Sequence, residues 1–76
     1  MKEAVEKIIK AIVAQPDEVE VSEFADGKNV KIEVRVAEGD MGKVIGREGR
    51  TVKAIRSILF FAGQKQGKRF QLDLVE

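Results

Sequence analysis

The chain contains no cysteine, histidine, tyrosine or tryptophan, and it contains a single proline. Without cysteine and histidine, it has neither disulfides nor the thiolate and imidazole ligands of zinc sites, so we expect no metal and no cofactor. Its hydroxyl groups are limited to Ser22, Thr51 and Ser57, and no histidine is present to activate one of them. Because 76 residues also leave little volume for a substrate cavity, we expect no enzymatic activity.

Long apolar runs are missing as well. The first ten residues already carry five charged side chains: Lys2, Glu3, Glu6, Lys7 and Lys10. The sequence therefore predicts neither a signal peptide nor a membrane span, and the absence of cysteine is typical of a protein of the reducing cytoplasm. A content of 43% hydrophobic and 36% charged residues predicts one packed domain, residues 1–76, with a strongly charged surface.

The net charge of +1 hides an asymmetry between the two halves of the chain. Residues 1–38 carry a net charge of −3, whereas residues 39–76 carry +4. Between positions 43 and 69, Glu48 is the only acidic residue, and the eight basic residues are Lys43, Arg47, Arg50, Lys53, Arg56, Lys65, Lys68 and Arg69. This concentration predicts a confined site for a polyanion, with a solvated basic helix face as the alternative.

Hydrophobic periodicity predicts the order α-β-β-α-α-β. The helices are expected over residues 2–15, 41–45 and 50–62, and the strands over residues 18–25, 28–37 and 69–76. Pro16 is expected to end the first helix, Asp40 to cap the second and Gly63 to end the third. Three strands with one apolar face, covered by three helices, predict an α+β domain. Its sheet should be mixed, because two helices between the second and third strands allow those strands to be parallel.

The first two strands are predicted to form a hairpin. Asp26-Gly27 is a preferred two-residue turn between segments that alternate in polarity. With these two residues as the loop, Val21 lies opposite Ile32 and Val19 lies opposite Val34. The register therefore gives the hairpin a single apolar face.

The stretch from Val44 to Val52 contains two glycines, three residues apart, between two predicted helices. Gly46 and Gly49 allow the backbone to turn through positive φ, and they allow another backbone to approach closely. A turn that leads directly into a helix points N–H groups and the positive end of the helix dipole outward, which suits a phosphate. The spacing matches neither a P-loop nor a dinucleotide-binding fingerprint. The alternative is that the glycines only end one helix and begin the next.

This stretch, Val44-Ile45-Gly46-Arg47-Glu48-Gly49-Arg50-Thr51-Val52, resembles the GxxG signature of the KH domain. The order α-β-β-α-α-β is similar to that of the type II KH fold, and the whole chain resembles the small stand-alone KH proteins of bacteria, the KhpA type. The resemblance implies binding of single-stranded RNA without catalysis, as in an RNA chaperone. The GxxG loop would clamp the backbone of about four nucleotides, with the bases in an apolar groove. It also implies pairing with a second copy or with another KH-domain protein.

The resemblance also implies a set of site residues. Gly46 and Gly49 would permit close approach of phosphate, Arg47 would supply charge, and amides near Gly49 and Arg50 would donate hydrogen bonds. Ile45 and the following helix would form one wall of the groove, and the strand from Arg69 with the loop 64–68 would form the other. Glu48 would weaken phosphate contact. The expected RNA-binding residues are Lys43, Ile45, Gly46, Arg47, Glu48, Gly49, Arg50, Lys53, Lys65 and Lys68. For the basic ones the alternative is ordinary exposed charge.

Three phenylalanines lie outside this scheme. Phe60 and Phe61 fall off the apolar stripe of their helix, and Phe24 falls on the polar face of the hairpin, at a bulge or a contact surface. For Phe60 and Phe61 we favour burial beneath the first helix, with a partner surface and base stacking as the alternatives. A protein-interaction or dimerisation module with a KH-like fold is therefore the alternative function.

Overall fold

The computed structural model describes residues 1–75, and the last residue of the predicted third strand, Glu76, lies outside them. Within these residues the helices are α1 (Lys2–Ile12), α2 (Met41–Ile45) and α3 (Arg50–Gln66), and the strands are β1 (Glu20–Asp26), β2 (Asn29–Arg35) and β3 (Arg69–Val75). Short 3₁₀ turns lie at Pro16–Glu18, Glu38–Asp40 and Arg47–Gly49. The predicted order α-β-β-α-α-β is confirmed.

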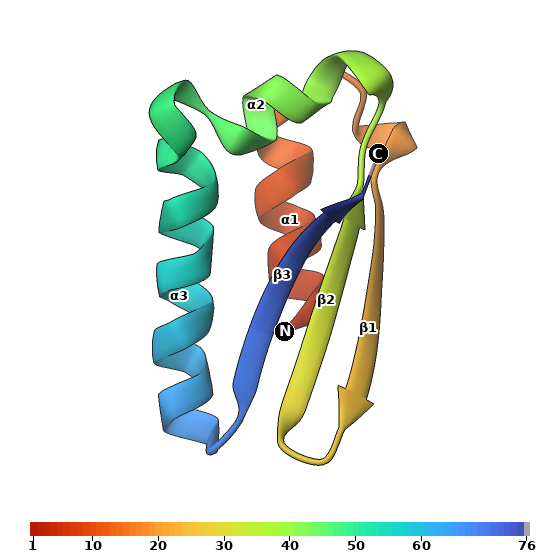
Figure 1. The fold of residues 1–76 in the computed structure, drawn as a ribbon. Coiled ribbons are helices and arrows are strands. Elements are labelled where there is room, and N and C mark those ends of the chain that lie inside the picture. Colours follow the sequence, from red (N-terminus) through yellow and green to blue (C-terminus); the bar gives the residue numbers. More distant parts are fainter. Residues whose placement is uncertain (76) are drawn as a thin grey trace.

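The described strands form one mixed sheet in the order β1-β2-β3. β1 pairs with β2 antiparallel and β2 pairs with β3 parallel, as predicted from the two helices that connect β2 to β3. Figure 1 shows α2 near the end of the sheet where β2 and β3 finish, with α3 running back along β3. One face of α3 therefore follows the free edge of the sheet.

The predicted hairpin register is wrong by two residues. Asp26 pairs with Asn29, so the loop is Gly27-Lys28, and Val21 lies opposite Val34. The favoured two-residue hairpin loops need a positive φ at their first position, and Gly27 meets this need with a φ of +64°. Asp26 remains in the strand. Because side chains alternate with a period of two, a register shift of two residues leaves every side chain on its predicted face. The hairpin therefore has the single apolar face that was predicted.

The core lies between this apolar face and the three helices (Figure 1). Its buried members are Val5, Ile9, Val19, Val21, Val30, Ile32, Val34, Val44, Val52, Ile55, Leu59 and Leu72. On the opposite face of the sheet, Lys31 pairs with Glu33 at 3.4 Å and with Asp73 at 3.2 Å. No helix among residues 1–75 combines the length and the apolar character needed to cross a bilayer.

α1 ends at Ile12, before the predicted boundary, because of a long-range hydrogen-bond acceptor. The amides of Ala14 and Gln15 donate to the two carboxylate oxygens of Asp40, at 3.1 and 3.0 Å, instead of continuing the helix. Asp40 was predicted to cap α2, but its side chain makes no capping hydrogen bond there. Its carboxylate instead ties the start of α2 to the end of α1.

α3 continues four residues beyond its predicted end at Ala62. Gly67, in the left-handed conformation, is its C-cap, whereas Gly63 lies inside the helix and is buried. A Cβ at Gly63 would collide with the carbonyl oxygen of Lys68 and lie 3.4 Å from Cδ2 of Phe70. Gly63 therefore allows the chain that enters β3 to pack against α3, and the predicted loop over residues 64–68 shrinks to Gly67 and Lys68.

Candidate nucleic-acid interface

The two glycines of the motif lie in the turn between α2 and α3, and both have positive φ. Gly46 has φ +77° and ψ 173°, and Gly49 has φ +73° and ψ 16°. A Cβ at Gly46 would lie 2.8 Å from Cβ of Thr51 and 2.9 Å from its backbone nitrogen, whereas Gly49 has no such neighbour within 4 Å. Glu48, between them, also has a positive φ of +56°. The turn thus depends on glycine at Gly46 for both conformation and space, and at Gly49 for conformation alone.

Two backbone amides of this turn form hydrogen bonds within the turn itself. The N–H of Gly49 donates to the carbonyl of Gly46 at 3.2 Å, and the N–H of Arg50 donates to the carbonyl of Arg47. The amides of Gly49 and Arg50 themselves are therefore engaged within the turn, while donation to phosphate by amides near them stays a prediction. Among the turn, loop and cap hydrogen bonds that lie outside the helices and strands of residues 1–75, none uses the amides of Arg47 and Glu48, which precede the N-terminus of the 17-residue α3.

Basic side chains surround the turn. Arg47 and Arg50 are exposed, as are Lys43 and Lys53 on the adjoining helices. Nη2 of Arg50 lies 3.6 Å from Oε2 of Glu48, and both side chains are about three-quarters exposed, at 76% and 74%. An ion pair in such a position contributes little to stability, so an approaching phosphate can replace the carboxylate as the partner of Arg50.

Asp40 fixes this unit to the rest of the domain. Its side chain is only 2% exposed, and it accepts hydrogen bonds from Ala14, Gln15 and, at 3.5 Å, from Nζ of Lys43. Burial by itself raises the pKa of Asp40, but these hydrogen bonds and the charge of Lys43 outweigh burial and hold the pKa below its ordinary value. The carboxylate is therefore charged at neutral pH and anchors the start of α2.

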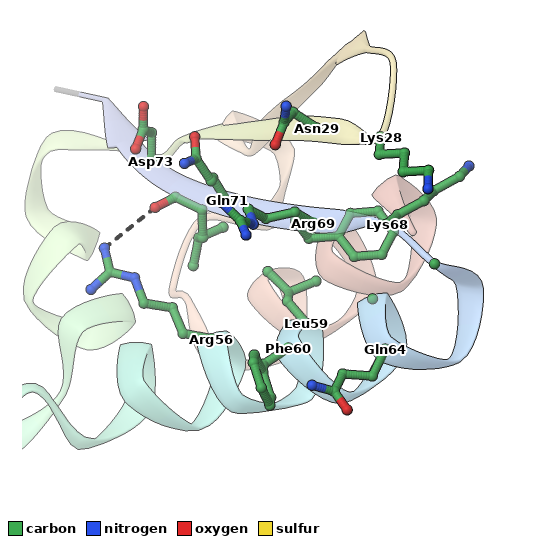
Figure 2. Close-up of a pocket in the computed structure, with 14 residues that line it drawn as sticks. Lys28, Asn29, Arg56, Leu59, Phe60, Gln64, Lys68, Arg69, Gln71 and Asp73 are labelled. Carbon is green, nitrogen blue, oxygen red and sulfur yellow. Dashed lines mark hydrogen bonds between the residues drawn. The ribbon is translucent and has the colours of Figure 1, made fainter.

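A groove runs between α3 and the free edge of β3, with a volume of about 1000 Å³ (Figure 2). Leu59 and Leu72 lie in its apolar part, and Gly63 leaves it unobstructed by a side chain. Arg56 and Asp73 line the end nearer the glycine turn, and Lys28 and Lys68 line the other end. Its volume is at the upper limit of the roughly 300–1,000 Å³ typical of small-molecule sites.

The sequence comparisons agree with this geometry. A family model described as KhpA/KhpB, KH domain matches residues 2–74. This chain belongs to that family. The KH fold expected from the motif, with its mixed three-stranded sheet and three helices, is thereby confirmed.

Curated relatives match over all or nearly all of their length. The RNA-binding protein KhpA of Halalkalibacterium halodurans is 50% identical over 76 residues, which are 100% of both chains. The protein of the same name from Clostridium acetobutylicum is 44% identical over 75 residues, 99% of this chain and 100% of the relative. That from Aquifex aeolicus is 43% identical over 76 residues, 100% of this chain and 96% of the relative. No solved structure matches the chain significantly.

The site residues expected of a KH domain fall into two groups along α3. Those from Lys43 to Lys53 cluster around the glycine turn, and Ile45 is exposed there at 38%. Lys68 lies beyond the other end of α3, roughly 25 Å away for a helix of this length. Lys65 is in the last turn of α3, outside the loop in which it was predicted, and it does not line the groove. The groove extends from Lys68 along α3 as far as Arg56, and no residue of the group at the turn lines it.

From the sequence, the loop 64–68 was expected to line the groove, but Arg56 and Phe60 were not singled out on the helix that forms the facing wall. Arg56, Phe60 and Gln64, which line it with Gly67, recur at helical spacing along α3, while Leu59 lies between α3 and β3 (Figure 2). Gly63 in the sequence was the available signal, since a helix packed closely on a strand requires a small residue there.

The phenylalanines are not buried by α1. Phe60 is 58% exposed and Phe61 is 67% exposed, with their rings edge to face at a centroid distance of 5.7 Å. The interpretation that we favoured from the sequence is therefore wrong. Phe60 lines the groove, whereas Phe61 does not. Phe24 is 55% exposed on the polar face of the sheet, opposite Lys31.

Proposed function

We propose that residues 1–76 act as a single, non-catalytic KH domain that binds single-stranded RNA in the cytoplasm, in the manner of an RNA chaperone. One observation supports this proposal above the others. The glycine turn carries two exposed arginines at the N-terminal end of α3, and a groove of about 1000 Å³ follows the same helix. The relatives named RNA-binding protein KhpA favour RNA as the polyanion.

The turn would hold the sugar-phosphate backbone. The amides of Arg47 and Glu48 and the side chains of Arg47 and Arg50 would face one or two phosphates, while Lys43 and Lys53 would add charge from either side. Gly46 and Gly49 would leave room for the strand, and the Glu48 carboxylate would keep the contact from being strong. Contacts of this kind carry no sequence information, so sequence preference from the turn is modest.

The groove would hold bases. Ile45 lies beside the turn, and Leu59 and Leu72 give the groove an apolar lining, while the exposed ring of Phe60 offers a surface for stacking. Bases in a duplex are already stacked and paired, so only an unpaired strand can place them there. Lys68 would meet the backbone of a strand that follows the groove to its far end, and Lys65 would act only through its general charge.

Arg47→Asp tests the proposal most directly. The substitution replaces a phosphate-binding charge by a repulsive one, so affinity for an octauridine RNA should fall by about tenfold or more. Fluorescence anisotropy on labelled RNA measures this, and log affinity should also fall linearly with log salt concentration. Lys7→Glu, with the same change of charge on the exposed surface of α1, is the control and should bind as the unaltered protein does.

Two results would count against the proposal. Equal affinity of Arg47→Asp and the unaltered protein would remove Arg47 from the site. Binding that does not depend on salt, or that is as tight for duplex RNA as for the single strand, would contradict the whole scheme of phosphate clamp and base groove.

Pairing with a second copy, or with another KH-domain protein, is a second candidate function. Ile58 is 51% exposed and Phe61 is 67% exposed, three residues apart on α3, and neither lines the groove. Joining two weak RNA-binding modules would raise the affinity for a longer strand, which gives such pairing a physical purpose.

The double substitution Ile58→Ser, Phe61→Ser tests this candidate by removing apolar area from that face. Light scattering after gel filtration should show a dimer for the unaltered protein and a monomer for the variant. Phe24→Ser removes a similarly exposed ring from the sheet and should leave the mass unchanged. A protein that is monomeric before and after the change contradicts pairing with itself.

A further inference from the structure

One side chain spans the groove. Nη2 of Arg56, on α3, donates a hydrogen bond of 3.3 Å to the carbonyl oxygen of Leu72 on β3 (Figure 2). β3 is an edge strand paired only with β2, so this carbonyl points toward α3 and takes no part in the sheet. The hydrogen bond thus joins the two walls of the groove at the end nearer the glycine turn.

Arg56 retains most of its hydrogen-bonding capacity. A guanidinium has five N–H donors, of which the bond to Leu72 uses one. Among residues 1–75, Arg56 forms no ion pair, since the nearby acid that lines the groove, Asp73, pairs with Lys31 at 3.2 Å. The carbonyl of Leu72 likewise has a second lone pair. Two adjacent donors and one acceptor therefore lie side by side at the edge of an apolar groove.

This row selects among the nucleobases by the order of their polar groups. The guanidinium of Arg56 offers a fork of two donors, and the carbonyl of Leu72 beside it offers an acceptor. A base that pairs with all three must present two neighbouring acceptors and then a donor. Cytosine has this order on its Watson–Crick edge, in O2, N3 and the N4 amino group, and guanine has it around O6, from N7 on the Hoogsteen edge to N1–H on the Watson–Crick edge. Adenine and uracil alternate acceptor, donor and acceptor, so one donor of the fork would face an N–H group. In an apolar setting such a mismatch is costly.

We propose that the guanidinium of Arg56 and the carbonyl of Leu72 form a base-recognition site that prefers cytosine and guanine to adenine and uracil. The site rests on the proposed function, because it needs a single strand in the groove. Arg56 follows Arg50 by six residues, about 9 Å along the helix. A strand whose phosphates lie on the glycine turn therefore passes this position.

Four oligonucleotides test the site. Each is an octauridine RNA, unaltered or with one central cytidine, guanosine or adenosine, so that a single guanosine cannot assemble into higher-order structures. Fluorescence anisotropy at fixed salt should give about tenfold tighter binding for the cytidine and guanosine versions than for the other two. The readout is this ratio, which does not depend on the fraction of active protein.

Arg56→Lys is the decisive variant, because lysine keeps the charge but lacks the planar fork. It should reduce the ratio to within about twofold, while Arg50→Lys, made in the same helix beside the turn, should keep it. Because Arg56 is exposed, the variant should unfold at the same temperature as the unaltered protein, and a thermal melt checks this.

The outcomes separate the two proposals. If none of the four RNAs binds, the proposed function fails and this site fails with it. If they bind but the adenosine or uridine version binds as tightly as the cytidine version, base recognition by Arg56 is overturned while RNA binding stands. The same conclusion follows if the preference is present and survives Arg56→Lys.

Discussion

The two ends of α3 each carry a pair of glycines, and the pairs serve different purposes. Gly46 and Gly49, before the helix, are partly exposed and lie beside the exposed side chains of Arg47 and Arg50. Gly63, near the other end, is buried against the backbone that enters β3, and Gly67 caps the helix. Spacing alone therefore does not identify a binding glycine. What the glycine faces, solvent with arginines or another part of the chain, decides its role.

The largest expected effect belongs to Gly63→Ala. The new Cβ would meet the carbonyl oxygen of Lys68, whose own N–H donates back to the carbonyl of Gly63 at 2.8 Å, so the two segments cannot separate without losing that bond. We expect a loss of about 2–3 kcal/mol in the free energy of unfolding, measured by urea denaturation.

Gly42→Ala is the matched control for this substitution. Gly42 lies in α2 with negative φ and no neighbour within 4 Å, so alanine should be neutral or stabilise the domain by up to about 1 kcal/mol. Equal stability of Gly63→Ala and the unaltered protein would show that α3 and β3 are not in close contact.

A smaller stability effect, with a clearer functional one, is expected for Gly49→Ala. Gly49 at φ +73° and Gly27 at φ +64° both have no neighbour within 4 Å, so alanine should cost each about 1–2 kcal/mol through backbone strain alone. Only Gly49→Ala should also weaken RNA binding severalfold, because relaxation of that strain moves the amides of Arg47 and Glu48. Denaturation and anisotropy on both variants separate the two effects. A loss of affinity in Gly27→Ala as large as in Gly49→Ala would mean that strain, and not the turn, is responsible.

The same contrast explains what the sequence could predict. The element order and the parallel pairing of β2 with β3 depend on local periodicity and connection length, and both were predicted. The position of the GxxG turn between two helices was also predicted, because glycines and flanking apolar residues mark it within a few positions. The hairpin register was missed by two residues, since Asp26-Gly27 and Gly27-Lys28 both fit the alternating pattern of β2.

The features that were missed depend on residues far apart in the chain. Asp40 ends α1 through hydrogen bonds to Ala14 and Gln15, at separations of 26 and 25 positions, which no local pattern encodes. Gly63 has no room for a side chain because the backbone of Lys68, at the entry to β3, packs against it. Arg56 was counted from the sequence only as one basic residue among eight. Its place in the groove follows from the packing of α3 along the edge of the sheet.

The smallest expected effect distinguishes two lysines near the C-terminal end of α3. Lys68 lines the groove and Lys65 does not, although both are exposed and carry the same charge. If RNA follows the groove from the glycine turn to this end, Lys68→Gln should lower affinity by about twofold to threefold and reduce the slope of log affinity against log salt by about one. Lys65→Gln should change neither quantity beyond the effect of net charge. If the slope of log affinity against log salt is the same for the two variants, the RNA strand leaves the protein before it reaches Lys68. Only the turn and the end of the groove near Arg56 would then bind it.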